Sequence, residues 1–586
     1  QQSGGGCVGG GVEQAKAVNT INGPVLIIAG AGSGKTRVIT FRIAHMLESG
    51  IPQSQILALT FTNKAAREME QRIKELTGKK LQNLTISTFH ALGVKILREY
   101  IDRLGWRQNF SIYDEVDRNQ LIRESAKELK IATETLDVYG VGTLFSQIKT
   151  GQKNFTAQTA VYRPLYNEYQ AGLKLFNAVD FDDLIMLPIK LFTEHPDVLA
   201  VYKNRYRYVM VDEFQDTSIQ QYQMMHLIAD DNVCVVGDDD QSIYSWRGAN
   251  YENIRLFEKD FPHLVEIKLE QNYRSTMNIL QAANELISNN NNRLGKNLWS
   301  EGNQGDPVGI YAAFNELDEA LFVASQIKTW IEDGGKLNDC AILYRSNSQS
   351  RVIEEALIRS QIPYRIYGGM RFFERQEIKD ALAYLRLIAN RQDDAAFERV
   401  INTPPRGIGD RTLDTLRNLT REHQITLWQA TNLALQENKL AGRAATALLR
   451  FMELINSLQR DTEEMPLFAQ TDFVIKHSGL YEMYKQEKGE KGEVRIENLE
   501  ELVSAAREFI KPEEAEDMTE LTAFLTHASL EAGEEQAAPH QACVEMMTLH
   551  SAKGLEFPRV FMIGVEEGLF PSFRSFEEAG RLEEER

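Results

Sequence analysis

Short apolar runs that end in polar or glycine-rich loops recur along the first part of the chain. Such runs lie at Val25–Ala29, Ile56–Phe61, Tyr208–Val211 and Val233–Val236, and the segment Thr36–Leu47 has helical periodicity. A buried strand followed by a loop and a helix is the order of an α/β nucleotide-binding domain. We therefore expect a parallel sheet whose loops gather at its carboxyl edge, where such sheets bind ligands.

The remainder alternates between helical stretches and a second α/β pattern. Between His90 and Arg205 the pattern is mostly helical, which predicts an insertion between strands of the first sheet. A second helical stretch covers Glu374–Leu530. The further strand candidates are Val308–Tyr311, Cys340–Tyr344, Tyr364–Tyr367, Val544–Leu549 and Val560–Ile563. The sequence thus predicts an α/β protein with two cores, each interrupted by a helical insertion.

Composition narrows this picture only slightly. The 586 residues are 43% hydrophobic but contain no apolar run long enough to span a membrane. The glycine-rich start lacks the basic and apolar parts of a secretion signal. The four cysteines are far apart and form no metal or disulfide pattern, which favours a reducing cytoplasm. A net charge of −19 argues weakly against nucleic-acid binding, because a local basic groove can lie on an acidic body.

The clearest candidate for chemistry is the loop after the first strand. It fits the phosphate-cradling pattern, with alanine in the first glycine position, over Ala29, Gly30, Ala31, Gly32, Ser33, Gly34, Lys35 and Thr36. Glycines let backbone N–H groups approach phosphates, Lys35 supplies a charge, and the Thr36 hydroxyl can bind Mg²⁺. A chance glycine-rich turn is the alternative, but the preceding strand and following helix argue against it.

A pair of carboxylates completes the requirements for hydrolysis. Asp212 and Glu213 follow the apolar run Tyr208–Val211 directly. Asp212 can hold the Mg²⁺ shell, and Glu213 can position or deprotonate the attacking water. Adjacent acids most often form a solvated turn, but the strand before them and the Gly-Lys-Thr loop upstream favour a catalytic pair.

Four longer motifs carry a family resemblance. Val211–Thr217 (VDEFQDT), Val236–Ala249 (VGDDDQSIYSWRGA), Leu269–Thr276 (LEQNYRST) and Thr548–Phe557 (TLHSAKGLEF) resemble the ordered motifs of superfamily 1 DNA helicases of the UvrD/PcrA/Rep group. The resemblance implies two RecA-like P-loop NTPase cores, the first formed by residues 1–88 and 206–275 and the second by 276–372 and 544–586. The helical insertions would then be residues 89–205 and 373–543.

The resemblance also implies a function. It predicts an ATP-dependent, 3′-to-5′ single-stranded DNA translocase and helicase of DNA repair or replication restart, in the bacterial cytoplasm at the nucleoid. ATP and Mg²⁺ are the implied cofactors, and ATP is expected between the two cores. The nucleotide-binding residues implied by position are Gln14 at the adenine, Arg37 beside the phosphate loop, Tyr273 stacked on the base, Arg274 at the γ-phosphate, Gln241 as the sensor that links phosphate to DNA, and Glu556 from the second core.

A motor that moves along a strand needs aromatic platforms for bases and polar contacts for phosphates. Tyr244, Trp246 and Arg247 offer that combination. By resemblance, Phe61 and Phe181 lie near the bases. Thr88, His90, Arg345, Asn347 and His550 lie along the strand, and the turn at Gly407 and Gly409 contacts the duplex ahead. Core packing for the aromatic residues, structural roles for the histidines and an ordinary loop at the glycines are the alternatives.

The expected partners are single-stranded DNA, junctions with duplex DNA, repair proteins and a second copy of the chain on DNA, with no membrane. In this family a further motif with a phosphate-contacting arginine follows the last residues of this chain, so we expect a fragment that keeps nucleotide and DNA binding better than unwinding. Three other functions are the alternatives: a helicase–nuclease, a nucleotide-gated DNA-binding module without turnover, and a small-molecule kinase. An ATPase assay with and without single-stranded DNA separates them.

Overall fold

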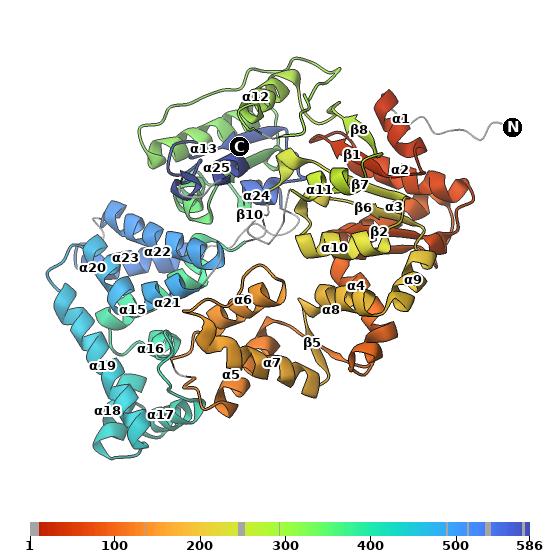
Figure 1. Ribbon diagram of the computed structural model, residues 1–586. Coiled ribbons are helices and arrows are strands. Elements are labelled where there is room, and N and C mark those ends of the chain that lie inside the picture. Colours follow the sequence, from red (N-terminus) through yellow and green to blue (C-terminus); the bar gives the residue numbers. More distant parts are fainter. Residues whose placement is uncertain are drawn as a thin grey trace. The chain divides into compact units, whose positions relative to one another are not determined.

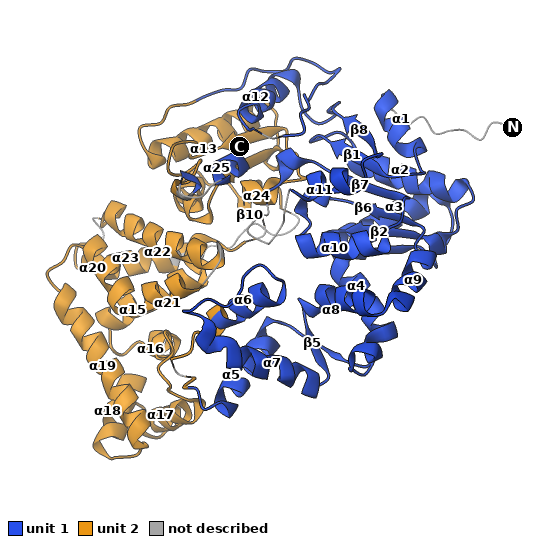
Figure 2. Cartoon of the chain, in the orientation of Figure 1, with its two compact units in different colours: residues 1–131, 141–310, 574–586 blue, residues 132–140, 311–573 orange. Residues whose placement is uncertain are grey.

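The computed structural model describes residues 11–133, 135–243, 252–291, 293–367, 369–487, 490–512, 515–533, 541–576 and 580–586. The chain forms two compact units (Figure 2). Unit 1 takes residues 1–131, 141–310 and 574–586, and unit 2 takes residues 132–140 and 311–573. The residue bounds predicted for the two cores and their two helical insertions remain predictions.

Unit 1 is built on a parallel sheet of six strands in the order β3-β2-β6-β7-β1-β8 (Figure 1). The sheet confirms the four strands expected from the apolar runs and adds two. Its strands are β1 (Val25–Ala29), β2 (Ile56–Thr60), β3 (Thr85–Thr88), β6 (Tyr208–Val211), β7 (Val233–Gly237) and β8 (Val265–Leu269). Every pairing is parallel, so the loops after the strands all leave from one edge.

Alternate residues of these strands serve two separate apolar cores. In β1, Leu26 and Ile28 pack with one core, whereas Val25, Ile27 and Ala29 pack with the other. A strand buried on both faces needs apolar residues at every position, which explains its continuous apolar run. The second core is covered by α1 (Val12–Asn19), α2 (Lys35–Glu48) and α3 (Asn63–Thr77), and the first by α4 (Phe89–Tyr100), α8 (Asp183–Glu194), α9 (Pro196–Arg205), α10 (Ile219–Ile228) and α11 (Asn253–Asp260).

The stretch between β3 and β6 is mostly helical, as expected. Besides α4, α8 and α9 it contains α5 (Glu115–Glu128), α6 (Val138–Lys149) and α7 (Arg163–Leu175). Two short strands, β4 (Ser111–Tyr113) and β5 (Ala178–Asp180), pair in parallel within it. Unit 1 also includes α12 (Met277–Ile287) and α25 (Arg581–Glu585).

Unit 2 contains a second parallel sheet in the order β10-β11-β9-β12. Its strands are β9 (Cys340–Tyr344), β10 (Tyr364–Ile366), β11 (Val544–Thr548) and β12 (Arg559–Met562). The helices α13 (Glu316–Glu332) and α14 (Ser350–Arg359) pack on one apolar face. The strand expected at Val308–Tyr311 is absent from the described structure: residues 308–311 have no sheet partner there, and Ile310 is 95% exposed. Apolar content alone therefore overpredicted a strand, because a strand also needs a neighbour for its backbone hydrogen bonds.

The helical insertion of unit 2 has its own core. Its described helices are α15 (Gln376–Ala389), α16 (Asp394–Val400), α17 (Asp410–His423), α18 (Leu427–Gln436), α19 (Gly442–Thr462), α20 (Leu467–His477), α21 (Leu480–Gln486), α22 (Glu490–Glu508) and α23 (Glu520–Gly533). The short helix α24 (Leu549–Ala552) follows β11. Large buried side chains such as Phe397, Phe451 and Tyr384 hold these helices together. The mostly helical pattern predicted over Glu374–Leu530 is confirmed.

Two further sequence expectations concern membranes and cysteines. Among the described residues, no helix combines the length and apolarity needed to cross a bilayer. Cys234, Cys340 and Cys543 are buried and unbridged. Burial raises the pKa of each of these thiols, so they behave as small apolar side chains.

Candidate active site

The loop between β1 and α2 has the backbone of a phosphate cradle. Gly32 and Gly34 have φ angles of 65° and 75°, in the left-handed region that favours glycine. A Cβ added to Gly32 would lie 2.4 Å from Asn272 Nδ2, so the loop also lacks space for a side chain. Gly34 is the N-cap of α2 and supplies no side-chain acceptor, which leaves the first N–H groups of the helix to bind an anion. The expected strand–loop–helix arrangement is confirmed.

Lys35 begins α2 and lies against the carboxylates that follow β6. Its Nζ is 3.5 Å from Asp212 Oδ1 and forms an ion pair with Glu213 Oε1. Burial alone would lower the pKa of Lys35, but the charges of Asp212 and Glu213 raise it well above its ordinary value. Burial raises the pKa of Asp212, partly offset by Lys35. The three residues predicted separately from two motifs therefore form one charged cluster at the carboxyl edge of the sheet.

Glu213 is held in a defined orientation. Its φ of 51° places it in the left-handed region, and its backbone N–H donates to Asp212 Oδ1 at 2.8 Å. Gln215, in the turn η4 (Phe214–Asp216), donates from Nε2 to Glu213 Oε2 at 2.7 Å. Both carboxylate oxygens of Glu213 are thus bound, one by Lys35 and one by Gln215, which restricts rotation of the side chain.

Gln215 also links this cluster to Gln241. Gln215 Oε1 accepts from the backbone N–H of Asp238 at 3.1 Å, at the end of β7. Asp238 Oδ2 in turn accepts from Gln241 Nε2 at 2.6 Å, in the turn η5 (Asp239–Gln241). Gln215 and Asp238 are not among the predicted site residues, although each lies within three residues of a predicted catalytic residue in the same motif. Their role depends on the adjacency of β6 and β7, which no local pattern specifies.

The segment after β8 closes over the phosphate loop. Tyr273 N–H donates to Gly32 O at 2.8 Å, and Asn272 Nδ2 donates to Ala31 O. From the other side, buried Gln14 donates to Ser33 O at 2.8 Å. Because Arg274 follows Tyr273 directly, four of the predicted nucleotide residues, Gln14, Lys35, Tyr273 and Arg274, lie around one loop. Arg37 lies in the first turn of α2 with its guanidinium 5.4 Å from the Phe41 ring centre.

The residues around the loop fit a magnesium–triphosphate ligand. Gly32 and Gly34 leave the backbone accessible, and Lys35 supplies a positive charge. Thr36, at the start of α2, and Asp212 offer the hard oxygen ligands that Mg²⁺ prefers.

Two of the predicted DNA residues, His90 and Phe181, lie together in unit 1. Their ring centres are 6.2 Å apart in an edge-to-face arrangement, and the Phe181 side chain is half exposed. Burial lowers the pKa of His90, which favours the neutral ring. Thr88 caps α4, accepting the Ala91 N–H at 3.1 Å, and Phe61 follows β2. Tyr244, Trp246 and Arg247 lie outside the described residues.

The aspartates on either side of Phe181, Asp180 and Asp183, belong to a buried ionic cluster. Lys149 Nζ, at the end of α6, lies 2.7 Å from Asp180 Oδ2 and 3.0 Å from Asp183 Oδ1. Tyr169 donates to the same Asp180 oxygen at 2.8 Å. Burial and the charge of Asp180 raise the pKa of Asp183 to about 7. The residues on either side of Phe181 are therefore both held by Lys149, a contact that no sequence motif predicts.

In unit 2, the predicted DNA residues lie where two neighbouring strands end. Tyr344 pairs with Thr548, so the ends of β9 and β11 coincide. Arg345 and Asn347 follow β9, His550 lies in α24 after β11, and Glu556 lies further along the same connection. Elsewhere in the unit, Gly407 has a φ of 74° and Gly409 is the N-cap of α17. This confirms the predicted glycine turn at a helix start, while its contact with DNA stays a prediction.

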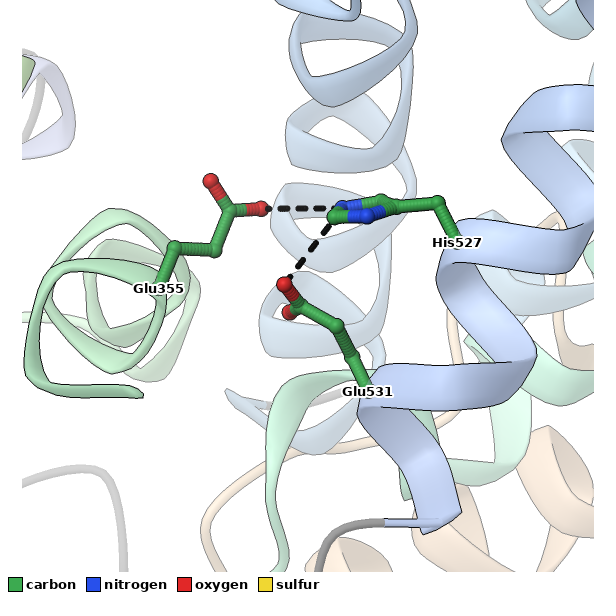
Figure 3. Close-up of side chains that lie close together, drawn as sticks. All are labelled: Glu355, His527 and Glu531. Carbon is green, nitrogen blue, oxygen red and sulfur yellow. Dashed lines mark ion pairs between the residues drawn. The ribbon is translucent and has the colours of Figure 1, made fainter. Parts of the chain in front are cut away.

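A separate ionisable cluster joins α14 to α23 (Figure 3). His527 Nε2 is 3.7 Å from Glu355 Oε1 and 3.4 Å from Glu531 Oε1. These three side chains could geometrically hold a cation. However, Arg351 NH1 already lies 3.2 Å from Glu355 Oε1, so a positive charge is present at the ligand oxygen. We interpret the cluster as an ionic clamp between the two helices.

A glycine loop with its lysine, a carboxylate pair across the sheet and a linked glutamine define a P-loop nucleoside triphosphatase. Comparison with known proteins narrows the class. Residues 11–262 match the UvrD/REP helicase N-terminal domain, and residues 267–586 match the UvrD-like helicase C-terminal domain. The chain therefore belongs to the UvrD/REP family of superfamily 1 helicases, and its two parallel sheets are those of RecA-like cores.

Individual relatives agree with this assignment. DNA helicase II of Haemophilus influenzae is 64% identical over 588 residues, which is 98% of this chain and 81% of the relative. DNA helicase II of Escherichia coli is 54% identical over 585 residues, with the same coverage. The ATP-dependent DNA helicase PcrA of Staphylococcus aureus is 43% identical over 587 residues, covering 98% of this chain and 80% of the relative.

Proposed function

We propose that this protein is an ATP-dependent DNA helicase that moves 3′ to 5′ along single-stranded DNA. The relatives named DNA helicase II and ATP-dependent DNA helicase PcrA support the activity class. The structural observation that carries the proposal is the contact of Lys35 with both Asp212 and Glu213 beside the glycine loop. That arrangement brings phosphate-binding and hydrolytic groups to one place.

The residues of the cluster divide the chemistry of phosphoryl transfer. Lys35 would neutralise charge on the phosphates, while Thr36 and Asp212 would hold Mg²⁺. When bound, Mg²⁺ supplies positive charge to the transferred phosphoryl group. Glu213 would orient or deprotonate the attacking water, a task that requires a fixed carboxylate. Its bonds to Lys35 and Gln215 provide that fixation.

The nucleotide base and the outer phosphate involve further residues. Gln14 would recognise the adenine edge and Tyr273 would stack on the base, and both already contact the phosphate loop. Arg274 would contact the γ-phosphate, for which a planar guanidinium is well suited. Arg37 beside the loop and Glu556 in unit 2 complete the proposed nucleotide set.

Contacts with DNA are proposed for both units. The edge-to-face pair of His90 and Phe181 offers an exposed aromatic surface on which a base can stack. Phe61 directly follows β2, and Thr88 ends the neighbouring strand β3, so both lie at the carboxyl edge of the same sheet. In unit 2, Arg345, Asn347 and His550 share the ends of two paired strands. Tyr244, Trp246, Arg247, Gly407 and Gly409 are proposed from the motifs alone.

Membership of the helicase family also suggests the DNA substrates and the cellular setting of this protein. Junctions between single-stranded and duplex DNA are the proposed substrates, and repair or replication restart at the bacterial nucleoid is the proposed setting. Contacts with repair proteins or with a second copy of the chain on DNA stay predictions.

The test is ATP hydrolysis with and without single-stranded oligonucleotide, comparing the chain with Lys35→Ala. Removal of a phosphate-stabilising charge should lower the DNA-stimulated rate by about 10²-fold or more. Binding of an oligonucleotide should change little, because Lys35 contacts the carboxylate cluster rather than the proposed track. Lys74→Ala, an exposed lysine on α3, is the matched control and should leave the rate unchanged. Undiminished hydrolysis by a folded Lys35→Ala protein would show that the site is elsewhere.

Two further outcomes separate the alternatives. Binding of nucleotide and DNA without turnover would support a nucleotide-gated DNA-binding protein instead. Direction is tested by displacement of streptavidin from biotin at either end of an oligonucleotide. Faster displacement from the 5′ end supports 3′-to-5′ movement, and the opposite preference contradicts it.

A further inference from the structure

Three consecutive aspartates, Asp238, Asp239 and Asp240, lie between β7 and Gln241. Residues 293–296 bind all three. Lys296 Nζ forms an ion pair with Asp238 Oδ1 and lies 2.6 Å from Asp240 Oδ2, with its side chain only 4% exposed. Arg293 donates from Nε and NH2 to the two oxygens of Asp240 at 3.1 and 2.7 Å. A lysine this deeply buried needs such partners, because an unpaired buried charge is strongly destabilising.

The third aspartate is bound by the same segment. Asp239 Oδ2 accepts the backbone N–H of Leu294 at 2.9 Å. The aspartate oxygens lie close enough together to hold a cation. Lys296 and Arg293 already bind oxygens of Asp238 and Asp240. Burial alone would lower the pKa of Lys296, but the charges of Asp238 and Asp240 raise it above its ordinary value. The cluster therefore serves to fix the loop after β7 onto residues 293–296.

Asp238 connects this cluster to the hydrolytic residues. One of its oxygens binds Lys296, and the other accepts the amide of Gln241. Its backbone N–H donates to Gln215, which donates to Glu213. Two successive contacts therefore connect Lys296 to Gln241, the proposed γ-phosphate sensor. Three connect it to Glu213, the proposed catalytic carboxylate.

A carboxylate paired with an ammonium group accepts hydrogen bonds but donates none. The Gln241 amide must therefore direct its nitrogen towards Asp238, and its oxygen then points away from Asp238. Without Lys296, nearly buried Asp238 would lose the cation that holds its carboxylate in place. Asp238 would then hold the Gln241 amide less firmly in this orientation.

We propose that Lys296 is a positioning residue that sets the orientation of Gln241 through Asp238, and so couples DNA binding to hydrolysis. The inference rests on the proposed function, since it assigns Gln241 the sensor role. Lys296 is not one of the proposed nucleotide or DNA residues; it contacts Asp238 and Asp240. Its effect should therefore appear in the stimulation of hydrolysis by DNA rather than in nucleotide or DNA affinity.

The experiment measures ATPase kcat, KM for ATP and oligonucleotide affinity for Lys296→Met, which keeps the length of the apolar stem. DNA-stimulated kcat should fall about tenfold or more, consistent with loss of one oriented hydrogen-bonding group. KM and oligonucleotide affinity should stay within about threefold. Arg293→Gln is the control within the cluster, because it leaves Asp238 paired with Lys296, and it should lower kcat less than Lys296→Met. Lys259→Met, on the exposed surface of α11, should have no effect.

A double-mutant cycle with Gln241→Ala distinguishes positioning from general structural support. In the Gln241→Ala background, Lys296→Met should add less than about a twofold further loss, because the residue it orients is already gone. Losses that multiply in the double variant would overturn the inference. Equal losses for Lys296→Met and Arg293→Gln would overturn it too.

Lys296→Met leaves carboxylates without their buried cation. A second variant therefore tests the proposal if the Lys296→Met protein does not fold. Asp238→Asn removes the charge with almost no change in shape and leaves Lys296 beside Asp240. It should reproduce the loss of DNA stimulation, and full stimulation in this variant would contradict the proposal. A wild-type chain without DNA stimulation would overturn the proposed function and this inference together, whereas normal stimulation that survives both substitutions would overturn the inference alone.

Discussion

Replacement of Lys149 by methionine should destabilise unit 1 strongly. Lys149, Asp180 and Asp183 each have side chains only 7% exposed, and the lysine lies within 3.0 Å of both carboxylates. An exposed ion pair of this kind would contribute only about 0–1 kcal/mol. Because the pair is buried, removal of the cation leaves two adjacent carboxylates without compensation, and the expected loss is about 3–5 kcal/mol. Methionine keeps most of the packing volume, so little of this loss would come from a cavity.

The pH dependence separates the electrostatic explanation from a packing defect. In the wild type, burial and Asp180 raise the pKa of Asp183 to about 7, while Lys149 works against that rise. Without Lys149 the pKa of Asp183 should rise further. A group with a raised folded pKa loses stability as pH increases through that value. The penalty for Lys149→Met should therefore be larger near pH 8 than near pH 5.5, where protonation of Asp183 relieves the repulsion.

Urea unfolding at the two pH values, followed by a probe in unit 1, measures this difference. Lys190→Met, an exposed lysine on neighbouring α8, is the matched control and should change stability by less than about 0.5 kcal/mol. Oligonucleotide affinity should also fall in Lys149→Met, because the clamped loop carries Phe181. A loss below about 1 kcal/mol, or one that does not vary with pH, would refute the assignment of a buried ionic clamp.

Two further predictions concern the phosphate loop and the clamp in unit 2. Gly32→Ala should lower nucleotide affinity about tenfold or more in a nucleotide titration, because its Cβ would lie 2.4 Å from Asn272 Nδ2. Gly50→Ala is the control: its backbone strain is similar but the space around it is open, so nucleotide affinity should stay normal. His527→Gln should destabilise the protein at pH 5.5 but much less at pH 8.5, since the Glu355 hydrogen bond and the charge of Glu531 raise the pKa of His527, and Arg351 and burial only partly oppose this. Stability from a raised histidine pKa is present below the unfolded value and lost above the folded one. Thermal unfolding at both pH values checks this, and a penalty that grows with pH would contradict it.

Local pattern was sufficient for much of the fold and for the centre of the site. The apolar runs at β1, β2, β6 and β7 predicted buried parallel strands, because a strand covered on both faces needs apolar residues throughout. The glycine loop with Lys35 and the acids after β6 could be recognised because their chemistry depends on residues that are close in sequence. The strand predicted at residues 308–311 was wrong, because that apolar run has no neighbouring strand among the described residues.

The order of strands and the partners of buried charges came only from the tertiary structure. Lys149 and Lys296 lie outside every recognised motif, and Gln215 and Asp238 lie inside motifs that do not show which residues they contact. Their roles arise from contacts between segments up to 58 residues apart. Local propensity and motif spacing are determined by neighbours along the chain, whereas ionic contacts between distant segments depend on which strands the folded sheet places side by side. The sequence therefore determined the class of chemistry, and the fold decided which other residues hold that chemistry in place.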